Sequence, residues 1–167
     1  TGNIAHRVAD ILRAAFDVRV LCWNPRRTAA ECAAWGYEQV ETLPELFRRS
    51  DFVNVSITQC DETRDRINAR LIGGANAELL RVNSAGGGIV NEHDLYVAQT
   101  TGQIRAAASD VFAHEPPASD DPLIHLDNFI ATFHIGGSTY ESLERVSNRA
   151  VDYVFQYTGV AARCGCR

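Results

Sequence analysis

The spacing of hydrophobic positions changes repeatedly along the chain, and each change predicts a different kind of element. Short apolar runs bounded by polar or turn residues predict five strands, over residues 18–23, 52–57, 79–83, 104–108 and 128–132. Helical spacing, or a capping residue followed by helix formers, predicts helices over residues 3–15, 28–34, 68–77 and 91–101, with others beginning at Thr42 and Ser138.

The alternation of predicted strands and helices indicates the fold class. Strands that are separated by helices form parallel sheets covered on both faces. Such sheets bind ligands at the carboxyl ends of their strands. The sequence therefore predicts a doubly wound α/β fold, with candidate chemistry in the loops that follow the five strands.

Composition narrows the class of protein. The chain has 167 residues, 46% of them hydrophobic, and a formal net charge of −5. These values suit a globular domain and argue against a general nucleic-acid binder. No apolar run is long enough to cross a membrane. The five cysteines are odd in number and indicate neither a disulfide framework nor a metal site, so we expect a cytoplasmic protein without a metal.

The first five residues fit the second half of a G-x-G-x-x-G/A dinucleotide fingerprint. Gly2 takes the second glycine position and Ala5 the third. A pyrophosphate would then lie at the N-terminus of the helix that begins with Asn3 and Ile4. The first glycine and the strand before it are absent from the sequence, so this evidence is weak by itself.

The end of the next predicted strand bears on the choice of dinucleotide. Asn24 lies about 20 residues on, where the fingerprint expects an acid that holds the ribose 2′-hydroxyl. Asparagine does not repel a 2′-phosphate, and Arg26 and Arg27 could pair with one. The pattern favours NADP over NAD; the alternative is that both arginines are simply solvated.

Two later loops carry an acid and a histidine. Glu115 follows the strand predicted over 104–108, and His134 follows the strand predicted over 128–132. A carboxylate beside an imidazole orients the ring and raises its pKa, which suits a proton donor and acceptor. Glu115 and His134 are therefore the candidate catalytic residues.

With these features the chain resembles the nucleotide-binding domain of the D-isomer-specific 2-hydroxyacid dehydrogenases. The resemblance extends from Gly2 to about Ala150. Its most specific segments are residues 50–55 (SDFVNV), 61–69 (DETRDRINA), 82–92 (VNSAGGGIVNE), 110–117 (DVFAHEPP) and 134–139 (HIGGST).

The resemblance implies hydride transfer between a nicotinamide cofactor, NADP or NAD, and C2 of a small 2-hydroxy or 2-oxo acid. It makes His134 the acid/base, Glu115 its carboxylate partner and Asp110 the residue that holds the nicotinamide carboxamide. The other positions that match the family's cofactor loops are Ile57, Thr58, Ser84, Ala85, Gly136 and Gly137. Members of the family commonly form homodimers, which makes a homodimer the expectation here.

One departure from the family pattern bears on activity. The family has an arginine after its N-x-A triplet, which clamps the substrate carboxylate, and this chain has Gly86 there. Loss of a bidentate guanidinium removes positioning and electrostatic stabilisation. The alternative function is therefore a catalytically impaired NAD(P)-binding module that acts in sensing or interaction. The Glu–His pair argues against a formate dehydrogenase of similar fold and says less about a phosphite dehydrogenase.

Two parts of the family's architecture have no counterpart in the sequence. The first, central strand of the nucleotide-binding sheet is missing, and so is the second domain that forms the other wall of the cleft. We expect residues 1–158 to be a fragment of the nucleotide-binding domain, followed by a tail over 159–167, with the substrate domain absent.

Overall fold

The computed structural model of the chain describes residues 2–24 and 26–159. The chain forms two compact units, which meet between Phe133 and His134 in the sequence, and each is described here by itself.

The first unit alternates strands and helices as the sequence predicts. Its strands are β1 (Leu21–Cys22), β2 (Glu38–Gln39), β3 (Phe52–Val55), β4 (Leu80–Asn83), β5 (Ala106–Ser109) and β6 (Phe129–Ala131). Its α-helices are α1 (Asn3–Phe16), α2 (Ala29–Ala34), α3 (Leu43–Arg49), α4 (Ala69–Ile72) and α5 (Glu92–Thr100), with 3₁₀ turns at Asp61–Thr63 and Pro122–His125.

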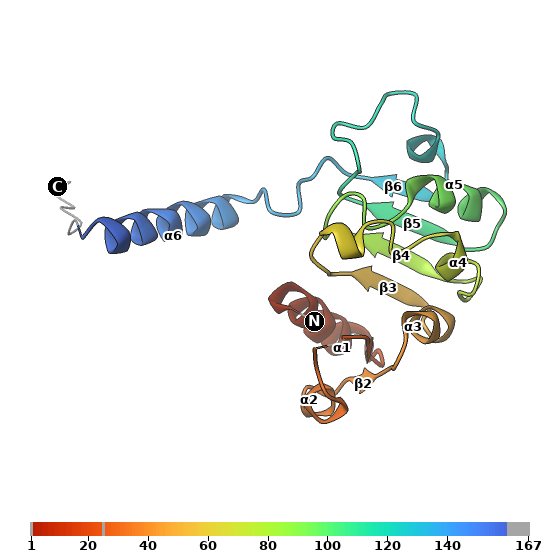
Figure 1. Ribbon diagram of the computed structural model, residues 1–167, viewed down its shortest axis with the longest axis horizontal. Helices are drawn as coiled ribbons and strands as arrows, with labels where there is room; N and C mark the ends of the chain where they lie inside the picture. The colour runs from red at the N-terminus through yellow and green to blue at the C-terminus, as the bar shows by residue number, and fades with distance from the viewer. Residues whose placement is uncertain (1, 25, 160–167) are drawn as a thin grey trace. The chain divides into compact units, whose positions relative to one another are not determined.

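All strand pairings are parallel, which confirms the predicted α/β class. Four strands form one sheet in the order β3-β4-β5-β6, and β1 pairs with β2 in a separate sheet. The arrows of the larger sheet point the same way in Figure 1, so the loops that follow these strands lie at one edge. This edge carries half of the candidate residues of the first unit: Ile57, Thr58, Ser84, Ala85, Asp110 and Glu115.

The β1–β2 pair and the four-stranded sheet are not joined by strand pairing within the described residues. Among residues 2–24 and 26–159, β1 pairs only with β2, and β3 pairs only with β4. A cavity of about 580 Å³ lies between α1, β1 and β3, and its lining includes Leu12, Cys22 and Val53. The apolar side of α1 faces this cavity, and Ala9, at 9% exposed, is the one buried residue of that helix.

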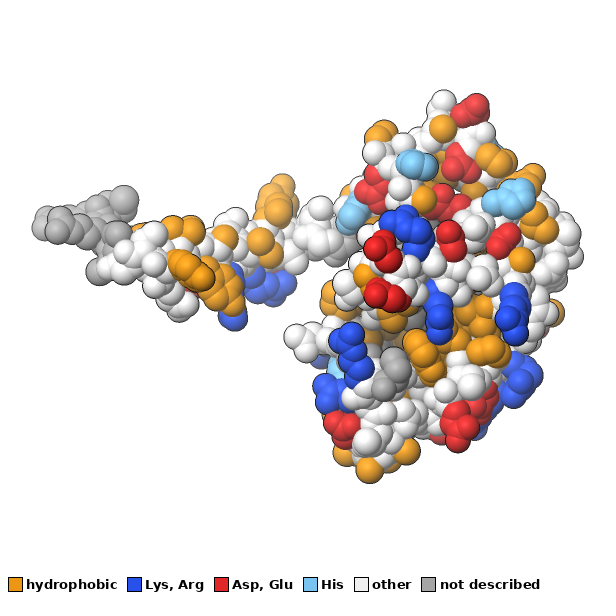
Figure 2. Space-filling view, in the orientation of Figure 1, with side chains coloured by type: hydrophobic (Ala, Val, Ile, Leu, Met, Phe, Trp, Pro, Cys, Tyr) orange, Lys and Arg blue, Asp and Glu red, His pale blue; other side chains and the backbone are white. Residues whose placement is uncertain are grey.

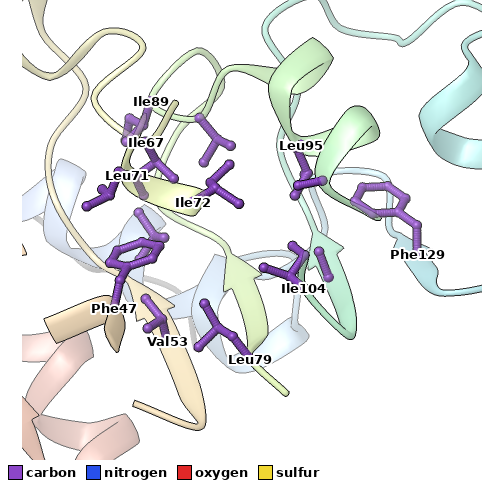
Figure 3. Packing of buried hydrophobic residues seen from close by; sticks show 14 of the residues in the cluster. Phe47, Val53, Ile67, Leu71, Ile72, Leu79, Ile89, Leu95, Ile104 and Phe129 are labelled. Atoms are coloured by element: carbon purple, nitrogen blue, oxygen red, sulfur yellow. The ribbon is translucent and has the colours of Figure 1, made fainter. Parts of the chain in front are cut away.

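The main core lies between the larger sheet and helices α3, α4 and α5. It contains Phe47 of α3, Ile72 of α4 and Leu95 of α5, each about 1% exposed, packed against strand residues such as Val53. Figure 3 shows these side chains pointing toward one another from helices and strands far apart in the sequence. Each such side chain contributes roughly 1.5–3 kcal/mol through burial, so this core holds the sheet edge in place.

Side-chain caps explain why the helices begin where they do. Thr28 and Glu31 form a capping box at α2, and Thr42 Oγ1 accepts the backbone N–H of Glu45 at α3 (3.2 Å). The cap of the last helix is Thr139 instead of the predicted Ser138, because Thr139 Oγ1 accepts the N–H of Ser142 (3.1 Å).

Several predicted elements are shorter in the structure, for physical reasons. The helix predicted over 68–77 ends at Ile72, because Gly73 and Gly74 weaken its continuation. The strand predicted over 18–23 pairs only over Leu21–Cys22, since it has a partner on one side alone. Strand β2 was not predicted, because Glu38 and Gln39 are polar and form no apolar run.

The described part of the second unit consists of a loop and one long helix, α6 (Tyr140–Thr158). The predicted apolar stripe is present, but its side chains are exposed, including Leu143, Val146 and Val154. Figure 2 shows apolar side chains along the surface of this helix. No helix among the described residues combines the length and hydropathy of a membrane span. The predicted tail lies outside the described residues from residue 160 onward.

Candidate functional site

The loop after β4 is ordered by the strand residue that precedes it. Asn83 is 2% exposed, and its side-chain amide donates to the carbonyl of Gly86 (3.2 Å) while its Oδ1 accepts the N–H of Ala85 (3.2 Å). These two hydrogen bonds fix the start of the loop, in which Ser84 and Ala85 are exposed at the sheet edge. Both are candidate cofactor-binding residues.

The loop after β5 begins with Asp110 and is tied to both neighbouring strands. Its N–H donates to the carbonyl of Asn83 (2.9 Å), and the Thr132 hydroxyl donates to its carboxylate. Further along the loop, Glu115 Oε1 accepts the N–H of Phe112 (2.9 Å). Asp110 and Glu115 therefore have carboxylates held by defined donors, in a loop that opens at the carboxyl edge of the sheet.

The N-terminus of α1 fits a bound anion. The first turn has no acidic residue and Gly2 provides no side-chain cap, so no side chain of that turn neutralises the positive end of the helix dipole. A Cβ atom at Gly2 would meet nothing within 4 Å, which leaves open space in front of the helix. Gly2, Asn3 and Ile4 are exposed. The pyrophosphate of a dinucleotide has the charge and size that such a helix end accepts.

The turn after β1 gives the two candidate arginines different surroundings. Asn24 Oδ1 accepts the N–H of Arg26 (2.9 Å), which shapes the turn. Arg27 pairs with Glu31 (2.9 Å) and lies over the Trp35 ring at 5.5 Å. The Thr28 backbone N–H and the Arg27 guanidinium lower the pKa of the Glu31 carboxyl. Arg27 is therefore neither simply solvated nor fully available to a phosphate.

The loop that precedes α6 belongs to the second unit and carries three candidate residues. His134 has φ of 53°, in the left-handed region that non-glycine residues rarely adopt. Conformations of this kind cluster at functional sites. Gly136 and Gly137 follow, and both are exposed.

The loop after β3 contributes Ile57 and Thr58, at the same edge of the sheet. The Thr58 carbonyl accepts the Thr63 hydroxyl (2.9 Å), which ties this loop to the 3₁₀ turn at Asp61–Thr63. Gln59 lies against the neighbouring loop, since a Cβ atom at Gly86 would come within 3.0 Å of the Gln59 Cβ. The two loops are therefore packed together at the position where the family has its arginine.

Two buried titratable side chains, those of Arg81 and Cys22, are not among the candidate site residues. Arg81 is 1% exposed, and its three guanidinium nitrogens have no hydrogen-bond partner among the described residues. Burial lowers the pKa of Arg81 to about 10, so the side chain remains charged at neutral pH. Burial, followed by the neighbouring Cys32 thiol, raises the pKa of the Cys22 thiol to about 12, which argues against Cys22 as a nucleophile. Within residues 2–24 and 26–159, no group of three or more His, Cys, Asp or Glu side chains could hold a metal ion.

Comparison with known proteins identifies the class to which this fold and edge belong. The sequence profile of the D-isomer specific 2-hydroxyacid dehydrogenase NAD binding domain matches residues 1–136. A hydroxypyruvate reductase of Thermotoga maritima is 35% identical over 162 residues, which are 95% of this chain and 51% of that protein. A D-3-phosphoglycerate dehydrogenase of Methanocaldococcus jannaschii is 37% identical over 141 residues, which are 84% of this chain and 26% of that protein.

Comparison with solved structures points to the same family. The holo crystal structure of Rhodotorula graminis D-mandelate dehydrogenase superposes with a TM-score of 0.87 at 27% identity, over 93% of this chain and 45% of that one. The chain belongs to the D-isomer-specific 2-hydroxyacid dehydrogenase family and corresponds to its NAD-binding domain. It spans about half the length of the hydroxypyruvate reductase, and about a quarter of the phosphoglycerate dehydrogenase.

Proposed function

We propose that the protein transfers a hydride between a nicotinamide dinucleotide and C2 of a small 2-hydroxy or 2-oxo acid. The observation that carries the proposal is the family match over residues 1–136, which includes every candidate residue except Gly137. The exposed residues at these loops and the uncapped start of α1 support it. The bound nicotinamide would supply the hydride chemistry.

The chain's own residues would hold the cofactor and move one proton. Gly2 and the first turn of α1 would bind the pyrophosphate, and Asp110 would orient the nicotinamide carboxamide. His134 would donate a proton to the substrate oxygen in reduction and take it back in oxidation. Glu115 would hold the imidazole in orientation and favour its protonated form.

The turn after β1 supports a preference for NADP. Asn24 places no negative charge there, and Arg26 has an exposed side chain that could pair with a 2′-phosphate. We expect the chain to bind NADPH more tightly than NADH, and R26A to weaken NADPH binding about tenfold while leaving NADH binding unchanged. Fluorescence titration of both cofactors measures this. Equal affinities in the unaltered chain, or tighter NADH, would show that the preference is wrong.

A chimera tests the activity directly. In it, this chain replaces the matched 162 residues of the Thermotoga maritima hydroxypyruvate reductase. We expect it to oxidise NADPH, followed at 340 nm, when hydroxypyruvate or glyoxylate is added. The unaltered reductase is the positive control. A folded chimera that binds NADPH but reduces neither acid would count against the proposed reaction.

The second candidate is an NAD(P)-binding module without turnover, and Gly86 is the observation that favours it. A Cβ at residue 86 would lie 3.0 Å from the Gln59 Cβ, so an arginine there requires a small shift of that neighbour. If the protein is an enzyme whose activity is lowered by the glycine at position 86, G86R in the chimera should raise kcat/KM about tenfold or more. G86A is the control for the added Cβ. A folded G86R chimera without turnover would favour the binding module.

The remaining parts of the proposal concern assembly and location. We propose that the protein is a homodimer, as members of the family commonly are. Light scattering at several concentrations tests this, and a mass of 18.4 kDa throughout would contradict it. Cys22, Cys32 and Cys60 are unpaired thiols, which suits a reducing compartment and supports a cytoplasmic location.

A further inference from the structure

We propose that Gly87 and Glu92 are positioning residues for the Glu115 carboxylate, acting through the Phe112–Ala113 peptide that both of them hold. The proposal rests on the proposed function, because Glu115 bears on the chemistry only as the partner of the acid/base histidine. The contacts that carry it all lie within the first unit.

Phe112 links the Glu115 carboxylate to the core. Its side chain is 5% exposed, and its ring meets Phe129 edge-on, with 6.3 Å between centroids. Its backbone N–H donates to Glu115 Oε1 (2.9 Å). Because this bond comes from the backbone of a residue whose side chain is buried, the position of the carboxylate follows the position of the Phe112 backbone.

Gly87 holds the Phe112–Ala113 peptide, which is joined to the Phe112 N–H through the Phe112 Cα, on its carbonyl side. A Cβ atom at Gly87 would lie 1.8 Å from the Phe112 carbonyl oxygen and 2.4 Å from the carbonyl carbon. Neither atom can move without displacing the loop backbone, so only glycine allows the β4–α5 loop to approach this closely. The requirement is for space, since Gly87 is not among the positive-φ glycines.

Glu92 holds the same peptide on its N–H side. It is the first residue of α5, and its Oε1 accepts the backbone N–H of Ala113 (2.7 Å). A hydrogen bond to an ionised carboxylate is shorter and roughly twice as strong as a neutral one. Gly87 and Glu92 therefore restrain consecutive backbone groups of Phe112 and Ala113 from two directions.

The pKa of Glu92 is raised overall, with burial as the largest cause, and the charges around it act in both directions. Burial raises the pKa of Glu92, and so does the negative charge of Asp121, whereas the Ala113 N–H, His114 and Arg81 lower it. Arg81 is the buried cation of this set, on the neighbouring strand β4. Its charge favours the ionised carboxylate, which is the stronger acceptor for Ala113.

Amide hydrogen exchange on the 167-residue chain tests the restraint without any cofactor. In E92A we expect the amides of Phe112 and Ala113 to exchange about tenfold faster or more, with a smaller effect in E92Q, which keeps a neutral acceptor. D94A is a matched control, because Asp94 lies in the same turn of α5 and accepts the Ala69 N–H at the same distance of 2.7 Å.

The expected pattern is specific to one loop. D94A should release Ala69 and leave Phe112 and Ala113 protected. Unchanged exchange at both amides in E92A, or equal loosening in D94A, would overturn the proposal. G87A should reproduce the E92A pattern, while G74A should not, since a Cβ at Gly74 meets its nearest atom only at 3.9 Å.

The functional half of the test uses the chimera and separates the two proposals. We expect E92A and E115Q both to lower kcat at least tenfold while the KM for NADPH changes less than twofold. E92Q should restore part of the E92A loss. If E115Q lowers kcat and E92A does not, Glu92 is not a positioning residue and the proposed function stands. If E115Q has no effect on kcat, the role proposed for Glu115 is wrong.

Discussion

R81M is expected to raise the free energy of unfolding by about 1–4 kcal/mol, because it removes a buried charge that has no hydrogen-bond partner among the described residues. Arg81 lies on β4 in register with Val53 and Ala107, at the buried side of the sheet. Its guanidinium nitrogens have no hydrogen-bond partner among the described residues. Methionine fills a similar volume without a charge, so its burial is favourable where that of arginine is costly.

Urea or thermal unfolding measures this effect, and R105M is the control. Arg105 is also close to the sheet, but its side chain is 67% exposed and pairs with Glu78 at the surface. Its replacement should change stability by less than about 0.5 kcal/mol. A destabilised R81M variant would mean that the guanidinium has a partner in solution.

Since Arg81 also favours the ionised form of Glu92, we expect R81M to be more stable than the unaltered protein and, in the chimera, less active.

H134N is expected to lower kcat/KM of the chimera by about 10²–10⁴-fold, the range that general acid–base catalysis contributes. Asparagine keeps a hydrogen-bonding side chain of similar reach but cannot exchange a proton near neutral pH. Binding of NADPH should be almost unchanged, because the histidine would act on the substrate oxygen. Steady-state kinetics with hydroxypyruvate measure the effect on catalysis, and a separate cofactor titration measures the effect on NADPH binding.

H125N provides the control for H134N. His125 ends the 3₁₀ turn at Pro122–His125, and its Nε2 lies 2.9 Å from the Ser119 carbonyl, so it has a local structural contact. Its replacement should leave kcat/KM within about twofold of the parent chimera. An H134N chimera that turns over as fast as the parent would exclude His134 as the acid/base.

The sequence predicted the parts of the fold that local chemistry determines. Thr28, Thr42 and Asn91 mark helix starts, because a short polar side chain satisfies free N–H groups wherever a helix begins. Strand ends were less well predicted, since pairing depends on neighbours that are distant in the sequence. Glu38–Gln39 shows this most clearly, because it is a strand only through its pairing with Leu21–Cys22.

The candidate site shows a similar division. The family resemblance pointed to Asp110, and the position after a predicted strand pointed to Glu115, but neither could show that Glu92 holds the adjacent backbone, since that contact spans 21 residues. Three successive glycines were a visible signal, but only the structure shows that Gly87 is the one pressed against Phe112. The pairing of Arg27 with Glu31 was equally accessible from their i, i+4 spacing, and it qualifies the role first considered for Arg27.

The central claim is that a nicotinamide dinucleotide binds at the loops along the carboxyl edge of the sheet. Two-dimensional ¹H–¹⁵N NMR of the 167-residue chain, titrated with NADPH, tests it most directly. We predict saturable shifts of the amides of Gly2, Asn3, Thr58, Ser84 and Asp110, with little change in α4. Absence of saturable shifts, or shifts confined to residues away from these loops, would contradict the claim.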